Sequence, residues 1–91
     1  MAVKADTVIL TGERAFAAAE LVYITAAKGV GILADQGVIH GAVADQVRGY
    51  NAIARDALVK GKAAADTAEK ARAAATLFDI ADRINAITGS Y

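Results

Sequence analysis

The sequence predicts an all-α protein, an up-down-up three-helix bundle with long first and third helices. Three observations favour this fold class. Apolar residues recur at spacings of three and four through most of the chain, which is the period of an amphipathic helix. About a quarter of the residues are alanine, the strongest helix former, and proline is absent. Glycines interrupt the pattern at two places, where the chain is expected to turn.

The first helix is expected over residues 7–36. Asp6 and Thr11 are both suitable N-caps, so its start falls between Asp6 and Gly12. It ends before Gly37, because glycine tolerates the left-handed backbone that commonly closes a helix. Its inner stripe is predicted to contain Phe16, Ala19, Tyr23, Ala26 and Val30, widened by Val22, Gly29 and Leu33.

The second helix is expected over residues 42–60, ending at Gly61, and the third over residues 63–87. The inner face of the second helix is predicted to hold Val43, Val47, Tyr50, Ala54, Ala57 and Leu58. The third helix has one predicted stripe of Ala64, Ala68, Ala71, Ala75, Phe78, Ala81 and Ile84, broadened by Leu77, Ile80 and Ile87. Its alanines gather near its start, which predicts closer packing there.

These helices are expected to form one domain over residues 1–91. Hydrophobic residues make up 56% of the chain, which excludes a disordered tail. Cysteine is absent, which excludes disulfides and thiolate metal sites. Alanine buries little area, and a domain of this size already buries only about 60% of its unfolded surface. The composition therefore favours a homo-oligomer or a larger protein assembly.

No transmembrane segment is expected. The most apolar stretch, Leu21–Ala34, is shorter than the roughly 20 residues that a membrane-spanning helix needs, and Lys28 interrupts it. The first ten residues have neither the apolar core nor the cleavage site of a signal peptide. Nothing in the pattern indicates a compartment.

The stretch Gly37–Gly41 has the composition of a turn between two helices. Val38 and Ile39 are expected to tuck into the end of the helix pair as an apolar plug. Asp45 is expected in the first turn of the next helix, where a carboxylate meets the positive end of the helix dipole.

His40, the only histidine, is the one residue of this stretch that the turn itself does not explain. A metal site needs three or four ligands, and the chain has no second histidine and no cysteine. A general base needs an orienting carboxylate and a nucleophile. Asp35 is close enough in sequence to be the carboxylate, but Ser90 is at the far end of the chain. We expect a solvent-facing loop residue, or else an oligomer contact, and no catalytic, metal or cofactor site.

Gly29 and Gly49 each lie ten residues from Ile39, so they face each other if the hairpin turns there. A glycine inside a helix costs roughly 1 kcal/mol relative to alanine. The pair therefore indicates a close helix crossing, where a side chain would clash. The alternative is that both glycines are exposed and merely tolerated.

The charges are balanced, with ten basic and ten acidic residues and no basic block, so nucleic-acid binding is not expected. Carboxylates that share a helix face have cations at helical spacing. Arg83 follows Asp79 by four residues, and Asp66 lies four residues from both Lys62 and Lys70. We interpret these groups as solvated ion-pair ladders rather than catalytic acid pairs.

A second apolar stripe on the first helix predicts an interface with another chain. Its candidate residues are Leu21, Ile24 and Ile32, with Tyr23 and Tyr50 as core or interface anchors. Thr7–Leu10 either extends this helix or docks as an arm on a neighbour. We expect a helical structural or assembly protein, not an enzyme, that packs with itself or with a partner. The alternative is a monomeric adaptor or inhibitor that binds one protein.

The segment Gly31–Ala68 contains a Gly-x-Ile-x-Gly corner at Gly37–Gly41, an alanine–arginine pair at residues 54 and 55, and a glycine at position 61. In this pattern it resembles a class of small alanine-rich phage proteins encoded near lysis and tail genes. Such proteins usually carry an N-terminal membrane anchor or lipoprotein signal, which residues 1–10 do not resemble. The resemblance therefore implies a component of a virion or its assembly rather than a lysis protein.

Overall fold

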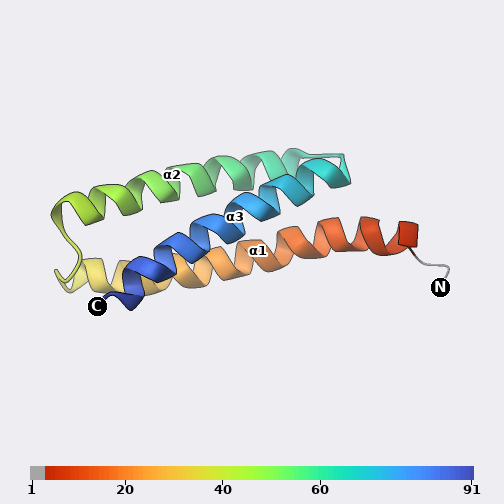
Figure 1. Ribbon diagram of the computed structural model, residues 1–91. Helices are drawn as coiled ribbons and strands as arrows, with labels where there is room; N and C mark the ends of the chain where they lie inside the picture. The colour runs from red at the N-terminus through yellow and green to blue at the C-terminus, as the bar shows by residue number, and fades with distance from the viewer. Residues whose placement is uncertain (1–3) are drawn as a thin grey trace.

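The computed structural model consists of three α-helices joined by two short turns, as the sequence predicts (Figure 1). It describes residues 4–91, with side chains described from residue 12 onward. Helix α1 spans Lys4–Asp35, α2 spans Gly41–Ala63 and α3 spans Thr67–Gly89, and the described residues contain no strand. Helices α1 and α3 run in the same direction and α2 runs in the opposite direction, which is the predicted up-down-up order, and α3 lies between the other two helices.

Helix α1 buries the predicted inner stripe. Each of its five residues is at most 7% exposed: Phe16, Ala19, Tyr23, Ala26 and Val30. The helix begins at Lys4, upstream of both predicted N-caps, and it includes Thr7–Leu10. The side chains of Asp6 and Thr11 lie outside the described part of the chain.

Helix α1 ends in a Schellman motif. Gly37 has a φ of +75°, the Val38 amide donates to the Leu33 carbonyl at 2.9 Å, and the Gly37 amide donates to the Ala34 carbonyl at 3.0 Å. Ile39 is buried as predicted, but Val38 is 38% exposed, so only half of the expected apolar plug forms. The left-handed residue redirects the chain sharply, and the two adjacent side chains then point to different sides.

Helix α2 begins at Gly41, with His40 as its N-cap residue. Asp45 therefore lies beyond the first turn, and the predicted contact with the helix dipole is wrong. Its carboxylate instead accepts a hydrogen bond from Arg48, three residues along the same helix. This is a surface ion pair with little effect on stability.

The predicted end of the second helix at Gly61 is wrong, because α2 continues through Gly61 to Ala63. Gly61 is buried, and a Cβ there would lie 2.1 Å from Cε1 of Phe16. The glycine thus makes room for an aromatic ring instead of closing the helix. Helices α2 and α3 have 23 residues each, because α2 continues beyond its predicted end and α3 starts only at Thr67. The long helix of the bundle is therefore α1 alone, with 32 residues, and not α1 and α3 together.

Helix α3 is capped by Asp66, whose carboxylate accepts a hydrogen bond from the Ala68 amide at 2.9 Å. The predicted ion-pair ladder around Asp66 is therefore wrong. Lys70 instead donates to the Gly61 carbonyl at 2.9 Å, and its Nζ lies 5.5 Å from the centre of the Phe16 ring.

The predicted alanine stripe of the third helix is wrong in its first half. Ala68, Ala71, Ala75 and Phe78 are exposed, and Ala64 is only half-buried. The buried residues are Ala73, Ala74, Leu77, Ile80, Ala81 and Ile84. The helix is rotated so that leucine and isoleucine lie inside, because burying these side chains is more favourable than burying alanine.

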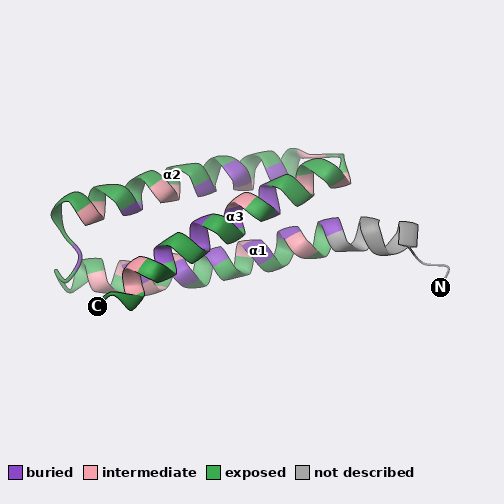
Figure 2. Cartoon of the chain, in the orientation of Figure 1, coloured by how far each residue is buried: buried purple, intermediate pink, exposed green. Residues whose placement is uncertain are grey.

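Helix α3 packs against both other helices, whereas α1 and α2 contact each other little. Figure 2 shows the buried residues along the surfaces that the helices turn toward one another. Near the start of α3 the approach to α1 is close, since a Cβ on Gly12 would lie 2.3 Å from Cγ2 of Thr67. Between α1 and α2 lie the larger side chains of Phe16 and Tyr23. Helix separation follows the size of the side chains at the contact.

The predicted close crossing at Gly29 and Gly49 is wrong within the protomer. No atom lies within 4 Å of the Cβ position of either residue. The hairpin of α1 and α2 does turn near Ile39, but both helices pack on α3 and contact each other little. Both glycines therefore lie against open space.

Candidate interaction surface

Among the described residues, four of the nine exposed large apolar side chains lie on α1, and the others are spread over the rest of the chain, with Val59 on α2 the most exposed at 68%. Leu21 is 66% exposed, Ile32 is 58% exposed, and Val22 and Ile24 are each 38% exposed. We call these four residues the outer face of α1. Leu21, Ile24 and Ile32 lie at the surface as the sequence predicts. Val22 was expected to widen the inner stripe, but the rotation of α1 leaves it partly in solvent.

The same helix is long and apolar enough to cross a membrane. The segment Gly12–Asp35 has 24 residues and a mean hydropathy of 1.5. The expectation that the apolar stretch of this helix is too short to cross a membrane is therefore wrong. The helix starts upstream of Leu21, and alanines extend the apolar segment in that direction. Its inner stripe nevertheless forms part of the core of the bundle. Core helices of soluble proteins meet the same criterion, although they are mostly buried and only 28% of this apolar window is. The segment is weak evidence for a bilayer.

The two tyrosines predicted as anchors differ in their surroundings. Tyr23 is buried, and its hydroxyl donates to Oδ1 of Asn51 at 2.8 Å, which joins α1 to α2. Burial raises the pKa of Tyr23, and the nearby positive charge of Arg55 partly opposes this. Tyr23 therefore belongs to the core rather than to an outer interface. Tyr50 is half-buried, and its hydroxyl accepts a hydrogen bond from Gln46 at 3.0 Å.

His40 is exposed at the turn between α1 and α2. Its backbone is extended, and its side chain makes no capping hydrogen bond to α2. Within residues 12–91, no group of three or more histidine, aspartate or glutamate side chains is placed to hold a metal ion. The turn therefore brings His40 no partner that would activate it for acid–base chemistry.

Most of the charged side chains whose partners are described lie in solvent, but Glu20, which pairs with Lys62 of α2 at 3.4 Å, and Lys70 are half-buried. Asp79 and Arg83 form the predicted ion pair at 3.0 Å, and Asp56 and Lys60 form another at 2.9 Å. Hydrogen bonds to these carboxylates raise the pKa of Arg83 and of Lys60. Across residues 12–91, no polar or charged residue is buried. These pairs stabilise charges that are already stable in water, which is the opposite of what a general acid or base requires.

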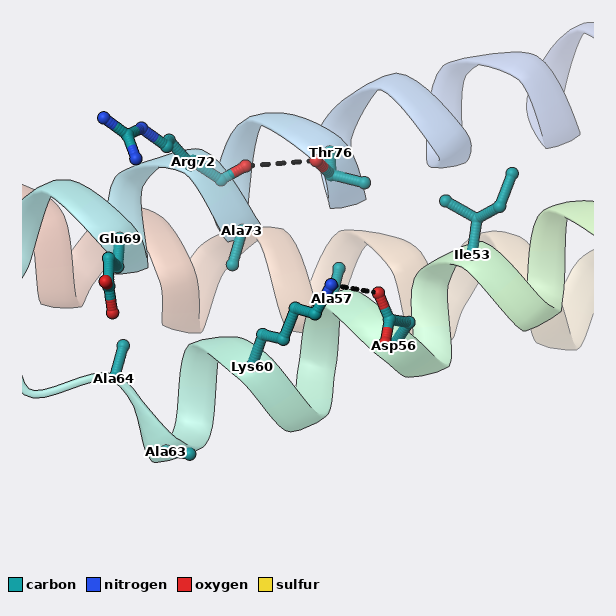
Figure 3. Close-up of a pocket in the computed structure, with 10 residues that line it drawn as sticks. All are labelled: Ile53, Asp56, Ala57, Lys60, Ala63, Ala64, Glu69, Arg72, Ala73 and Thr76. Carbon is teal, nitrogen blue, oxygen red and sulfur yellow. Dashed lines mark hydrogen bonds and ion pairs between the residues drawn. The ribbon is translucent and has the colours of Figure 1, made fainter.

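A groove of about 510 Å³ lies between α2 and α3 (Figure 3). Ile53 and Ala57 from α2 and Ala73 from α3 form its apolar floor. The rim carries both signs of charge, and the Arg72 guanidinium points away from the groove. The sequence did not predict this groove, because it depends on the rotation of α3. Its shape suits an apolar side chain better than a polar metabolite.

Comparison with protein-family models, with curated proteins and with solved structures gave no match. The residues and geometry of this chain therefore carry the functional argument.

Proposed function

We propose that this protein is a non-enzymatic structural or assembly subunit that functions by packing its helices against copies of itself. The observation that carries the proposal is the outer face of α1, where four large apolar side chains are between 38% and 66% exposed. Single exposed apolar residues are ordinary, but Leu21 and Ile32 lie on the same side of α1, and several exposed apolar residues on one side of a helix are typical of an interface. Burying such a face against a second chain removes apolar surface from water.

The chemistry of the remaining surface supports a non-catalytic role. The histidine is exposed, and the described ion pairs have the geometry of solvated helix pairs. The balanced charge also favours self-association, because ten basic and ten acidic residues leave no net repulsion between copies.

The test is the molar mass in solution, measured by light scattering after size exclusion over a wide range of protein concentration. We expect a discrete oligomer or a growing polymer, with a mass at least twice the 9.3 kDa of one chain. A mass of 9.3 kDa at every concentration contradicts the proposal.

A pair of glutamate variants locates the effect on the surface. Val22→Glu places a charge in the outer face of α1 and is expected to shift the protein toward the monomer. Ala52→Glu places the same charge on an exposed position of α2 and is expected to leave the mass unchanged. Equal shifts in both variants would indicate a general effect of charge instead.

The groove between α2 and α3 favours the second candidate, a monomeric adaptor or inhibitor that binds one protein partner. An apolar floor with a charged rim is the usual form of a small docking site. The same measurement separates the two candidates, because an adaptor stays a monomer at all concentrations. Its partner would then be sought with Ile53→Glu as the binding-deficient control.

We extend the proposal to a setting in a bacteriophage particle or its assembly, on the resemblance of segment 31–68 alone. Its corner at Gly37–Gly41 does lie between two helices, but the glycine at position 61 does not end a helix. Mass spectrometry of particles from the source that encodes the chain tests this setting. We expect the chain in stoichiometric amount, and its absence from purified particles contradicts a virion role.

A further inference from the structure

We propose that the partner on α1 is the α1 helix of a second copy, packed antiparallel so that Arg14 of each copy meets Asp35 of the other. This inference rests on the proposed function, and it specifies which surface self-associates and in what orientation. It follows from one stripe of α1, from the charges at its ends and from a glycine that the protomer leaves unexplained.

One stripe of α1, which lies between the core-facing side and the solvent side and includes Ala15 at the edge of the core, contains no charge over its whole length. Its residues recur at alternating spacings of three and four, the repeat of a two-helix seam. We call it the α1 seam, and it consists of Ala15, Ala18, Val22, Thr25, Gly29 and Ile32. Four of the six are exposed, and the other two are half-buried. The Thr25 hydroxyl donates to the Leu21 carbonyl of its own helix at 2.9 Å, so the seam needs no outside polar partner there.

An antiparallel arrangement brings the largest residue of the seam opposite a small one. With Val22 of one copy beside Thr25 of the other, Ala15 faces Ile32, and the two small residues Ala18 and Gly29 face each other, twice each by symmetry. The small pair lets the two backbones approach closely. A parallel arrangement would instead set Ile32 on Ile32 and crowd that layer.

The charges beside the seam select the same orientation. Arg14 and Asp35 are both exposed and lie on one flank of the seam, at its opposite ends. Antiparallel pairing with the register above sets Arg14 beside Asp35 of the second copy at both ends. Lys28 then lies along Leu21 of the second copy, where its methylene stem covers apolar surface and its ammonium group reaches water. Parallel pairing would bring like charges to the same end.

Gly29 adds an independent observation. Glycine inside a helix is unfavourable relative to alanine, and Gly29 is the open helical glycine that lies in the seam, whereas Gly31 and Gly49 are open but lie outside it. No described atom of the protomer lies within 4 Å of a Cβ at Gly29. A second helix crossing at the seam supplies a packing reason for this glycine, because it approaches most closely where the side chain is missing.

A lipid bilayer is the competing occupant of this face. Helix α1 would have to insert with Lys28 within the apolar segment and with its inner stripe withdrawn from the core. A charged residue such as Lys28 is costly inside the bilayer. It incurs no such cost when the seam packs against a second copy, because its ammonium group stays in water. The structure therefore favours the second copy.

Cysteine cross-linking tests the orientation directly, because the natural chain has no cysteine. In the antiparallel register, residues 18 and 29 of opposite copies are neighbours. Two copies of residue 18, or two of residue 29, are about 16 Å apart along the axis. A disulfide needs Cα atoms within about 7 Å. We expect Ala18→Cys and Gly29→Cys to form a disulfide dimer only when the two proteins are mixed and oxidised, and neither to do so alone.

A matched pair of glycine variants tests the close approach. Gly29→Leu and Gly31→Leu both replace a helical glycine that is open in the protomer, so both should keep the helical circular dichroism and raise the urea midpoint of the monomer by similar amounts. Only Gly29→Leu fills the seam. We expect it to raise the dissociation constant of the dimer about tenfold or more, and Gly31→Leu to change it little.

The outcomes separate this inference from the proposed function. An oligomer by light scattering with no cross-link in the mixture, or with cross-links in each single variant, overturns the antiparallel α1 contact and leaves self-assembly standing. A monomer at every concentration overturns both. A monomer that also sediments with neutral phosphatidylcholine vesicles overturns both in favour of the bilayer.

Discussion

Two pairs of helical glycines in this protein have opposite surroundings. At Gly12 and Gly61 an added Cβ would lie within 2.3 Å of Thr67 or Phe16, so these glycines permit close packing inside the protomer. At Gly29 and Gly49 an added Cβ would meet nothing within 4 Å. The first pair lies at the end of the bundle where α3 begins, and the second lies toward the turn between α1 and α2.

The difference shows that a glycine inside a helix marks close packing only when a large side chain or another backbone is directed at it. Gly61 is explained by the Phe16 ring, and Gly12 by Thr67. Helices α1 and α2 contact each other little, so Gly49 has no such neighbour. We call the end of the bundle at Gly12 and Gly61 the closed end, and the end at Gly29 and Gly49 the open end. Substitutions at the closed end should therefore change stability strongly, and substitutions at the open end weakly.

The largest expected effect is at Phe16, which fills the space left by Gly61. Phe16→Ala should lower the free energy of unfolding by about 3–5 kcal/mol, because a buried ring is lost and a cavity remains. Urea unfolding at one fixed protein concentration measures this. Phe78→Ala is the control, since Phe78 is 37% exposed and Phe16 only 7%. Equal losses at the two positions would contradict a closed end centred on Phe16.

A smaller loss is expected from a single methyl group at Gly61. Gly61→Ala should destabilise the protein by about 1–3 kcal/mol, although alanine is the better helix former, because the Cβ overlaps the Phe16 ring. Combining it with Phe16→Leu should recover part of the loss, since the shorter side chain vacates the ring position. Strict additivity of the two substitutions would show that they do not share one space.

Tyr23 bridges the gap between α1 and α2, and its effect should depend on pH. Tyr23→Phe removes the hydrogen bond to Asn51 and should cost about 1 kcal/mol at neutral pH. Burial raises the pKa of Tyr23 above its ordinary value of 10.0. The neutral hydroxyl is therefore favoured in the folded state, and its stabilisation is complete below that value and lost as the pH rises through the raised pKa.

The measurement is the difference in unfolding free energy between the natural protein and Tyr23→Phe, from about pH 8 to 11. We expect this difference to be constant at the lower end and to shrink above the ordinary tyrosine pKa. A difference that stays constant throughout would show that Tyr23 ionises as freely in the fold as in water.

The smallest effect, and the only gain, is expected at the open end. Gly49→Ala should stabilise the protein by about 0.5–1 kcal/mol, because alanine restricts the unfolded chain and nothing in the protomer opposes its methyl group. Thermal unfolding followed by circular dichroism is sufficient to detect it. A loss of stability would reveal a neighbour at Gly49 that the fold does not show.

The sequence predicts the fold class, the order of the helices and the inner stripe of α1 because each depends on one unambiguous period. In α1 the aromatic residues Phe16 and Tyr23 mark the same face as the alanines. The surface position of Leu21 and Ile32 follows directly, because these residues lie on the opposite side of the same helix.

The sequence does not predict the rotation of α3 or the role of Gly61. Alanine occurs all round α3, so two stripes have the same period, and only the burial of Leu77, Ile80 and Ile84 decides between them. From the sequence alone, Gly61 after Lys60 looks the same whether it ends the second helix or makes room for the ring of Phe16. The groove around Ile53 depends on both features, so it could be found only in three dimensions.

Helix α3 is synthesised after α1 and α2, and it is also the one on which both other helices pack. While a ribosome is still translating Thr67–Gly89, the apolar inner stripe of α1 contacts only α2, through Phe16 beside Gly61 and Tyr23 beside Asn51. The bundle therefore closes only after α3 has been synthesised, and until then the nascent chain displays both faces of α1. Chains growing side by side on one messenger RNA would meet in this state, so assembly and folding of the subunit would overlap in time.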